Sequence, residues 1–135
     1  MEEVIKYTNN IASQILSKEF KPLSQLKVPK KQGVYLIKDK KVGKIIYVGK
    51  STNLYNRIVI QHNSRKNHVA GSILRIKLNR SGITYDKIAD FLQNKCLFVI
   101  EEIEDFDVCH LVEALLIAIL RKQNQPLLNE MKQKI

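Results

Sequence analysis

Apolar residues recur at helical spacing in the first twenty residues of the chain. They are Val4, Ile5, Ile11, Ile15 and Leu16, and this spacing predicts a helix within residues 1–20. Residues 21–32 contain two prolines and several lysines without such a period, so they are expected to form a basic connector.

Helix-capping residues mark the starts of the later helices. Ser51, Thr52 and Asn53 offer N-caps for a helix from about Leu54 to His62. The remaining predicted helices cover residues 68–80, ending near Gly82, residues 84–92, capped by Thr84, and a long segment from Asp105 or Asp107 to about Lys122. Pro126 then indicates an irregular tail.

Two short runs of β-branched and aromatic residues predict a β-hairpin. The runs are Val34 to Lys38 and Lys44 to Val48, and residues 39–43 supply the turn. Symmetry about Lys41 would pair Val34 with Val48 and place Tyr35 opposite Tyr47. One face would then be aliphatic, with Val34, Leu36, Ile46 and Val48, and the other would carry both phenols together with Ile37 and Ile45.

A third strand is predicted over residues 96–103, from the apolar run Leu97-Phe98-Val99-Ile100. The order helix, hairpin, helices, strand, helix is typical of an α+β fold, here a small antiparallel three-stranded sheet flanked by helices. A chain of 135 residues suits one domain.

The charge narrows the range of partners. The formal net charge is +10, and residues 50–80 hold seven basic side chains and no acidic one. Such a domain favours a polyanion such as nucleic acid, although a basic face that only contacts solvent is the alternative. The start Met1-Glu2-Glu3 lacks the features of a signal peptide and no stretch is long enough to span a membrane, so we expect a cytoplasmic protein with no membrane partner.

The cysteines and histidines predict no zinc site. Cys96 and Cys109 are not spaced as a metal-ligand pair and are expected to be small buried apolar residues. The three histidines are too scattered to bind zinc alone.

Glu113 interrupts the apolar run from Leu111 to Leu120. A helix that is apolar nearly all round is expected to be largely buried, and a carboxylate within it must be paired, bound to a metal or placed at an exposed edge. One carboxylate can hold a Mg²⁺ that keeps several waters and accepts a phosphate oxygen. An arginine such as Arg57 suits the charge on that phosphate, and a phenol can act as a base if a cation such as Lys50 lowers its pKa.

Taken in order, these residues resemble the GIY-YIG nuclease superfamily. The pattern consists of Gly33-Val34-Tyr35, then Tyr47-Val48-Gly49-Lys50-Ser51-Thr52-Asn53-Leu54, then Arg57-Ile58, with Glu113 on a later helix and Pro126-Leu127-Leu128-Asn129 near the end. It covers roughly residues 30–130 as the catalytic core, with a helical insertion at about 63–95. Residues 1–29 precede the core as a helix and connector.

The resemblance implies a role for each matching residue. Tyr35 and Tyr47 would bracket the attacking water and the scissile phosphate, one of them as general base. Lys50 would tune that phenol or contact the phosphate, Arg57 would stabilise phosphate charge, Glu113 would hold one Mg²⁺ or Mn²⁺, and Asn129 would orient the site. Arg65, Lys66, Arg75 and Lys77, together with Lys50 and Arg57, are the expected nucleic-acid contacts.

One position departs from the family pattern. Many members carry a histidine or tyrosine one helical turn after the arginine, where this chain has Gln61 followed by His62. Either His62 takes this role through a small change of helical register, or the role is absent. The acidic residues between Glu101 and Asp107 are expected to be a solvated turn and helix cap, not metal ligands.

The predicted function is therefore a metal-dependent DNA endonuclease. Its alternatives are a non-catalytic or partner-dependent nucleic-acid-binding protein of the same fold and, less favoured, an RNA-binding protein; RNA also stays open as the substrate. The chain shows no separate recognition module, so sequence-specific double-strand cutting would require a homodimer or higher homo-oligomer. Without one, the enzyme would nick with weak preference or depend on a partner.

Overall fold

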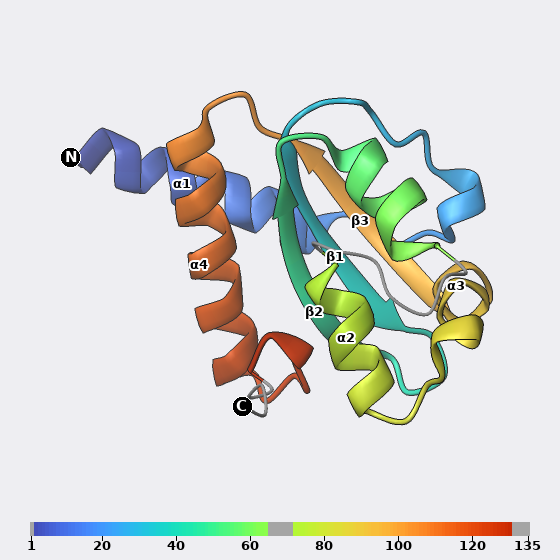
Figure 1. The fold of residues 1–135 in the computed structure, drawn as a ribbon. Coiled ribbons are helices and arrows are strands. Elements are labelled where there is room, and N and C mark those ends of the chain that lie inside the picture. Colours follow the sequence, from blue (N-terminus) through green and yellow to red (C-terminus); the bar gives the residue numbers. More distant parts are fainter. Residues whose placement is uncertain (1, 65–71, 131–135) are drawn as a thin grey trace.

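The computed structural model describes residues 2–64 and 72–130 of the chain. Its centre is a three-stranded antiparallel sheet in the order β2-β1-β3, formed by β1 (Gly33–Asp39), β2 (Lys44–Ser51) and β3 (Cys96–Glu102). Helices cover both faces of this sheet (Figure 1). The α+β prediction with three antiparallel strands is therefore confirmed.

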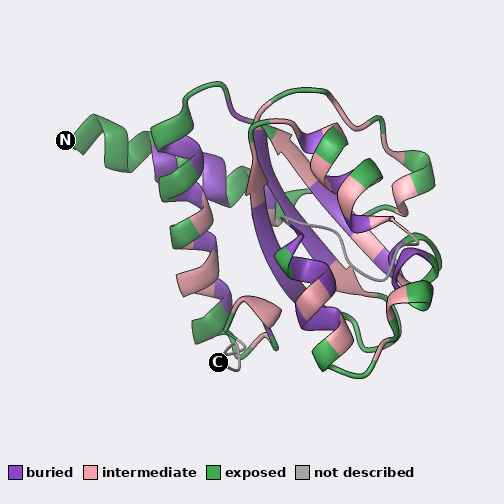
Figure 2. Ribbon diagram, in the orientation of Figure 1, coloured by how far each residue is buried: buried purple, intermediate pink, exposed green. Residues whose placement is uncertain are grey.

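The two faces of the sheet carry separate apolar clusters. The long helices α1 (Glu2–Ser17) and α4 (Phe106–Lys122) pack on the face that contains Val34, Leu36 and Val48. The other face carries Tyr35, Ile37 and Tyr47, and it is covered by the π-helix η2 (Asn56–His62), α2 (Ile73–Arg80) and α3 (Tyr85–Asn94). Figure 2 shows the strands buried along most of their length, whereas the first turns of α1 are exposed.

The hairpin forms, but its register differs from the predicted one. Leu36, not Val34, lies opposite Val48, and Tyr35 lies opposite Gly49. The pairing shifts between Ile37 and Lys38 because β2 contains a bulge, so the turn is not symmetric about Lys41. The bulge also exchanges the two isoleucines: Ile45 packs with the aliphatic cluster and Ile46 with the tyrosine cluster. The two tyrosines still share one face, as predicted.

Both outer strands of the sheet are covered along part of their free edges. Lys21, in the connector, exchanges two backbone hydrogen bonds with Phe98 of β3, of 2.7 and 3.0 Å. At the opposite edge, side chains from the C-terminal segment bind the backbone of β2. Such cover removes the unpaired groups through which edge strands aggregate.

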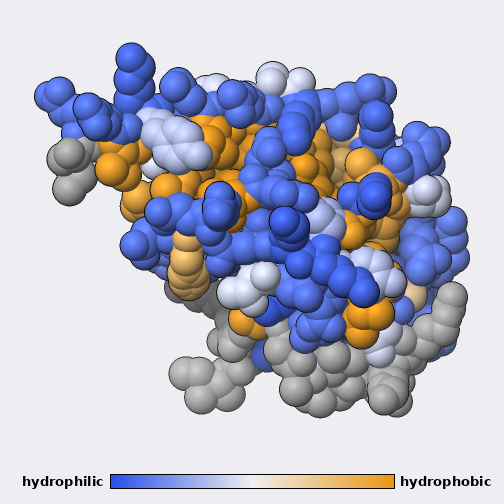
Figure 3. Space-filling view, turned by 90° about the horizontal axis from the view of Figure 1, so that it is seen from above, coloured by the Kyte–Doolittle hydropathy of each residue, from blue (hydrophilic) through white to orange (hydrophobic). Residues whose placement is uncertain are grey.

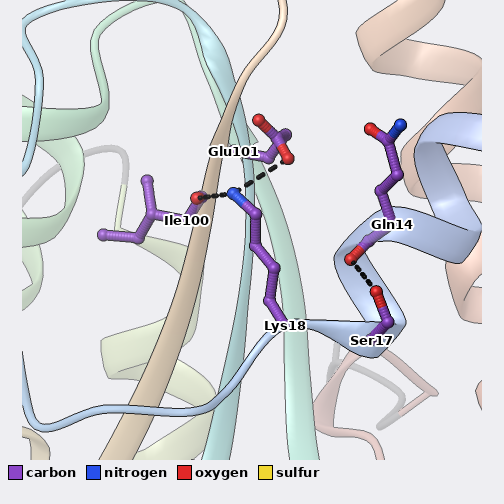
Figure 4. Close-up of polar contacts among 5 residues, drawn as sticks. All are labelled: Gln14, Ser17, Lys18, Ile100 and Glu101. Carbon is purple, nitrogen blue, oxygen red and sulfur yellow. Dashed lines mark hydrogen bonds and ion pairs between the residues drawn. The ribbon is translucent and has the colours of Figure 1, made fainter.

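The end of α1 is tied to β3 by polar contacts. Lys18 Nζ lies 2.9 Å from Glu101 Oε1 and donates to the Ile100 carbonyl at 3.2 Å, and Ser17 Oγ donates to the Gln14 carbonyl at 2.8 Å within the last turn (Figure 4). These contacts fix the point at which the chain leaves α1 for the connector. The connector itself contains a short 3₁₀ turn, η1 (Leu23–Gln25).

The predicted helix boundaries agree closely with the structure where it describes them. Asp105 caps α4 by accepting from the Val108 N–H, and Thr84 stands at the N-cap of α3. The predicted helix over 68–80 is described from Ile73 only. The irregular tail contains a 3₁₀ turn, η3 (Leu128–Glu130). Within the described residues, no helix combines the length and the apolar character that crossing a membrane requires.

The expectation that the last helix is largely buried is wrong. Val112, Leu116 and Leu120 are buried, but Leu111 and Ala114 are exposed and Ile117 is half-buried. α4 lies on the sheet with one side only, and α1 covers part of another side. α4 therefore carries more apolar side chains than it buries in the core of this chain.

Candidate active site

The predicted catalytic residues converge around the C-terminal end of β2. Tyr35 and Tyr47 come from adjacent strands, Arg57 from η2 and Glu113 from α4. The two phenol rings lie 6.1 Å apart between centroids and tilt by 44°. Arg57 lowers and Glu113 raises the pKa of both phenols, so all four side chains lie within one electrostatic field. Sequence positions spread over nearly eighty residues thus form one site.

Gly49 allows Tyr35 to occupy this place. A Cβ atom built on Gly49 would lie 2.2 Å from the Tyr35 ring, which is closer than any real contact. The ring therefore lies directly over the backbone of the neighbouring strand. Gly33 is similarly confined, because a Cβ there would lie 2.1 Å from the Glu101 carbonyl oxygen. Both motif positions therefore require glycine, because a neighbouring side chain or carbonyl group occupies the place of a Cβ atom.

Burial raises the pKa of both phenols. It is the largest cause for Tyr47, whose pKa rises to about 12, and Glu113 adds to the effect while Arg57 opposes it. The pKa of Tyr35 is raised well above its usual range by burial first and then by Tyr47. The cation that favours the charged form of each phenol is therefore Arg57. Lys50, which was expected to do this, instead places its Nζ 3.0 Å from Glu113 Oε1.

His62 lies directly against Tyr35. The Tyr35 hydroxyl and His62 Nε2 are 2.6 Å apart, and His62 Nδ1 is 2.9 Å from Ser72 Oγ. Burial, with Arg57 and Arg75 as further causes, lowers the pKa of His62 to about 3, so the ring is neutral and carries one N–H. His62 is the partner that the structure gives the buried Tyr35 hydroxyl. We therefore assign Tyr35 as donor to Nε2 and His62 Nδ1–H as donor to Ser72.

The π-helix explains how His62 reaches this position. η2 runs from Asn56 to His62, and a π-helix closes its turn over five residues instead of four. His62 therefore follows Arg57 by one π turn, as the predicted change of register requires. Gln61, at the usual family position, is half-buried and does not contact the phenols in the described contacts.

Asn129 acts on the backbone next to Tyr47. Its Oδ1 accepts from the Val48 N–H at 2.9 Å, and its Nδ2 donates to the Val48 carbonyl at 2.7 Å. Gln125 Oε1 accepts from the Ile45 N–H at 2.9 Å in the same way. These two amides continue the sheet beyond β2. Asn129 thus holds the edge of the strand that carries Tyr47.

Glu113 is the acidic side chain that acts on both phenols of this cluster. Its side chain is half-buried, at 20% exposure, and reaches the surface beside Lys50. Within the described residues, no group of three or more His, Cys, Asp or Glu side chains gathers to hold a metal. A lone carboxylate does not suit zinc, which takes three or four protein ligands. It does suit Mg²⁺, which keeps water ligands and binds through one or two carboxylates plus substrate phosphate.

The expected basic surface is only partly where it was predicted. Arg57 is partly exposed and lines the cavity beside Lys50, and its guanidinium forms no hydrogen bond or ion pair within residues 2–64 and 72–130. Arg75 is fully buried, 5.3 Å from the Tyr85 ring, and Lys77 is 8% exposed and donates to the Asn129 carbonyl. Both side chains are therefore buried in this structure, unlike the exposed basic surface that was expected. Arg65 and Lys66 lie outside the described residues.

Ser72 and Gln125 were not anticipated from the sequence. Ser72 stands at the N-cap of α2 but forms no capping bond with its side chain, which binds His62 instead. Ser72 was expected to lie inside the predicted helix over 68–80, and nothing in the sequence singled it out. Its contact crosses from η2 to the start of α2, and that of Gln125 joins segments 80 residues apart, so neither contact leaves a signal in the local pattern.

The fold and site define a small α+β domain in which two tyrosines, an arginine and a glutamate surround the end of a β-hairpin. Residues 31–125 match the family model described as GIY-YIG catalytic domain. The chain belongs to this family, whose members are nucleases. Comparison with curated proteins and with solved structures gave no match.

Proposed function

We propose that this protein is a metal-dependent endonuclease that hydrolyses DNA phosphodiester bonds. The observation that carries the proposal is the convergence of Tyr35, Tyr47, Arg57 and Glu113 at the end of β2 in a chain of this family. A phosphodiester hydrolase needs charge neutralisation, a positioned water and a proton acceptor. The residues of this cluster can supply each of them.

Arg57 binds the scissile phosphate in this proposal. Its planar fork donates two hydrogen bonds to phosphate oxygens and keeps its charge at any physiological pH. Glu113 would hold the Mg²⁺ or Mn²⁺, and Lys50, 3.0 Å from its carboxylate, would contact the same phosphate. The ion, when bound, would neutralise phosphate charge and lower the pKa of a bound water.

Tyr35 is the phenol that we assign as general base. A phenol must lose its own proton before it can take one from water, and Tyr35 has a neutral acceptor, His62 Nε2, at 2.6 Å. Arg57 is one cause of the low His62 pKa. A bound phosphodiester would offset that positive charge and make proton transfer to His62 less costly. Tyr47, nearer the surface and nearer the metal ligand, would orient the water.

The alternative is a protein of the same fold that binds nucleic acid but does not cut it. Such a protein would either lack activity altogether or cut only when a partner protein is bound. It would need the basic surface but neither Glu113 nor the Tyr35–His62 contact. Retention of a half-buried carboxylate beside two buried phenols favours the enzyme.

A plasmid assay separates the two functions. Supercoiled DNA is incubated with the full chain and Mg²⁺, Mn²⁺ or EDTA, with wild type beside Glu113→Ala and the control Glu3→Ala, which removes an exposed carboxylate from α1. We expect nicked or linear DNA with either metal for wild type and Glu3→Ala, and at least a hundredfold loss for Glu113→Ala. DNA binding without cleavage by wild type would support the alternative. Linearisation in discrete bands would indicate an oligomer that cuts both strands at a site.

A further inference from the structure

A cavity of about 180 Å³ opens beside the catalytic cluster. It is lined by Lys50 and Ser51 at the end of β2, Arg57 of η2, Gln32 before β1, and Phe106 and Cys109 of α4. These elements meet at the upper end of the sheet in Figure 1. Seen from that end, several patches of hydrophobic side chains alternate with hydrophilic ones (Figure 3). The cavity thus combines two cations with an aromatic ring.

Phe106 contributes nothing to the apolar core. It is 51% exposed and belongs to neither of the two core clusters. It occupies the first position of α4, directly after the cap Asp105, where helix formation makes no demand for an aromatic residue. A large aromatic side chain held at the rim of a cationic cavity is therefore available to a ligand.

The cations that line the cavity and the acidic residues next to Phe106 in the chain indicate where each part of a nucleotide would lie. Lys50 and Arg57 attract a phosphate. Phe106 lies between the exposed carboxylates Asp105 and Asp107 in the chain, with Glu104 before them. Phosphate is repelled there, whereas a nucleobase is neutral, offers a flat face to the ring and carries amino groups that can donate to carboxylates.

We propose that Phe106 stacks on a nucleobase next to the scissile phosphate. This inference rests on the proposed nuclease function and specifies its substrate. In a continuous duplex both faces of each base are covered by neighbouring bases. Phe106 therefore selects DNA in which a base at the cut is unstacked, as in a single strand, a bulge or a gap, or is extruded by the protein.

The absence of tryptophan from this chain allows a direct test. Phe106→Trp creates a single fluorescent reporter at the proposed stacking position, and Leu111→Trp places the same reporter at an exposed residue of α4 that does not line the cavity. Both are titrated in EDTA with a single-stranded oligonucleotide, a duplex with a one-nucleotide bulge and a perfect duplex. Occupancy is followed by the anisotropy of a label on the DNA.

The expected result is strong quenching of the Phe106→Trp fluorescence by the single strand and the bulge, little quenching by the perfect duplex at equal occupancy, and none for Leu111→Trp. Phe106→Ala should weaken binding to the unpaired substrates by roughly ten- to hundredfold, the usual value of one base–aromatic stack. It should leave binding to the perfect duplex within about twofold of wild type, because phosphate contacts carry that binding.

Several results would overturn the proposal. Equal quenching at both tryptophan positions, or an unchanged substrate preference in Phe106→Ala, would show that Phe106 does not stack on a base. Cleavage by Phe106→Ala at the wild-type rate on every substrate would also reject it while leaving the nuclease function intact. Failure of wild type to bind any of the DNA substrates would reject both proposals together.

Discussion

At the scale of single residues, the most informative contact is the buried chain Ser72–His62–Tyr35. All three side chains are at most 1% exposed, and hydrogen bonds of 2.9 and 2.6 Å give both ring nitrogens of His62 a hydroxyl partner. Arg57 and Arg75 supply positive charge on the same side of the molecule. A protonated His62 would therefore be both desolvated and repelled, so the fold requires the neutral ring.

This requirement predicts a pH dependence of stability. The pKa of His62 is about 3 in the folded protein, against 6.5 for an unperturbed histidine. Between these two pKa values the unfolded chain binds one more proton than the folded protein. The free energy of unfolding therefore increases with pH over this range and decreases as the pH falls. We expect a loss of about 2 kcal/mol from pH 7 to pH 5, measured by urea unfolding.

Two variants identify the group responsible. His62→Gln should be less stable at pH 7 and should lose most of this dependence on pH. His110→Gln, which changes an exposed histidine of α4, should retain it. If His62→Gln loses stability on acidification as steeply as wild type does, another group causes the effect.

At the scale of elements, the sequence predicted the type of almost every segment but not how the segments meet. The alternation of Val34, Tyr35 and Leu36 was enough to assign the two faces of β1. It was not enough for β2, because a bulge changes the register of one strand without changing its composition. The same limit applies to η2: its capping residues predicted a helix, but its π turn, which carries His62 to Tyr35, depends on tertiary packing.

The cluster of two tyrosines, an arginine and a glutamate was predictable because the family pattern specifies residue types at fixed spacing. Tyr35, Tyr47, Arg57 and Glu113 were identified and are brought together. Arg75 and Lys77 were identified from charge alone, and charge does not distinguish a basic surface from a buried cation beside an aromatic ring. Ser72 could not be found, because its contact with His62 depends on how η2 and α2 pack and not on a local pattern.

The edge of β2 gives a prediction for one element. Asn129→Ala removes both hydrogen bonds to Val48, whose backbone N–H and carbonyl are then left without partners in a residue that is 0% exposed. The expected loss is about 2–3 kcal/mol in the free energy of unfolding. Hydrogen exchange at the Val48 amide should accelerate, and cleavage should fall because β2 carries Tyr47.

Asn129→Asp provides the matched control. It keeps an acceptor for the Val48 N–H but loses the donor to the Val48 carbonyl, so its stability should lie between those of wild type and Asn129→Ala. Gln123→Ala, at an exposed position after α4, should behave as wild type. Equal stability of Asn129→Ala and wild type would mean that water replaces the amide and that the tail does not support the strand.

At the scale of the whole molecule, the net charge is +10, and exposed lysines lie both at the end of the sheet that holds the site and at the hairpin turn. Lys31 is exposed beside Gln32 at the site end, and Lys41 is exposed in the hairpin turn at the opposite end. Only lysines that contact DNA release counterions when it binds. The net charge alone therefore does not define the DNA-binding surface.

The salt dependence of binding does define it. For wild type, the logarithm of the binding constant should fall linearly with the logarithm of salt concentration, measured by anisotropy in EDTA between about 50 and 200 mM. Lys31→Gln should reduce the magnitude of this slope by about one, since each phosphate contact contributes roughly 0.9 to it. Lys41→Gln removes the same charge from the far end of the sheet and should leave the slope unchanged. Equal slopes for the two variants would mean that DNA contacts the domain without a preferred face, which is incompatible with a scissile phosphate held between Arg57 and Glu113.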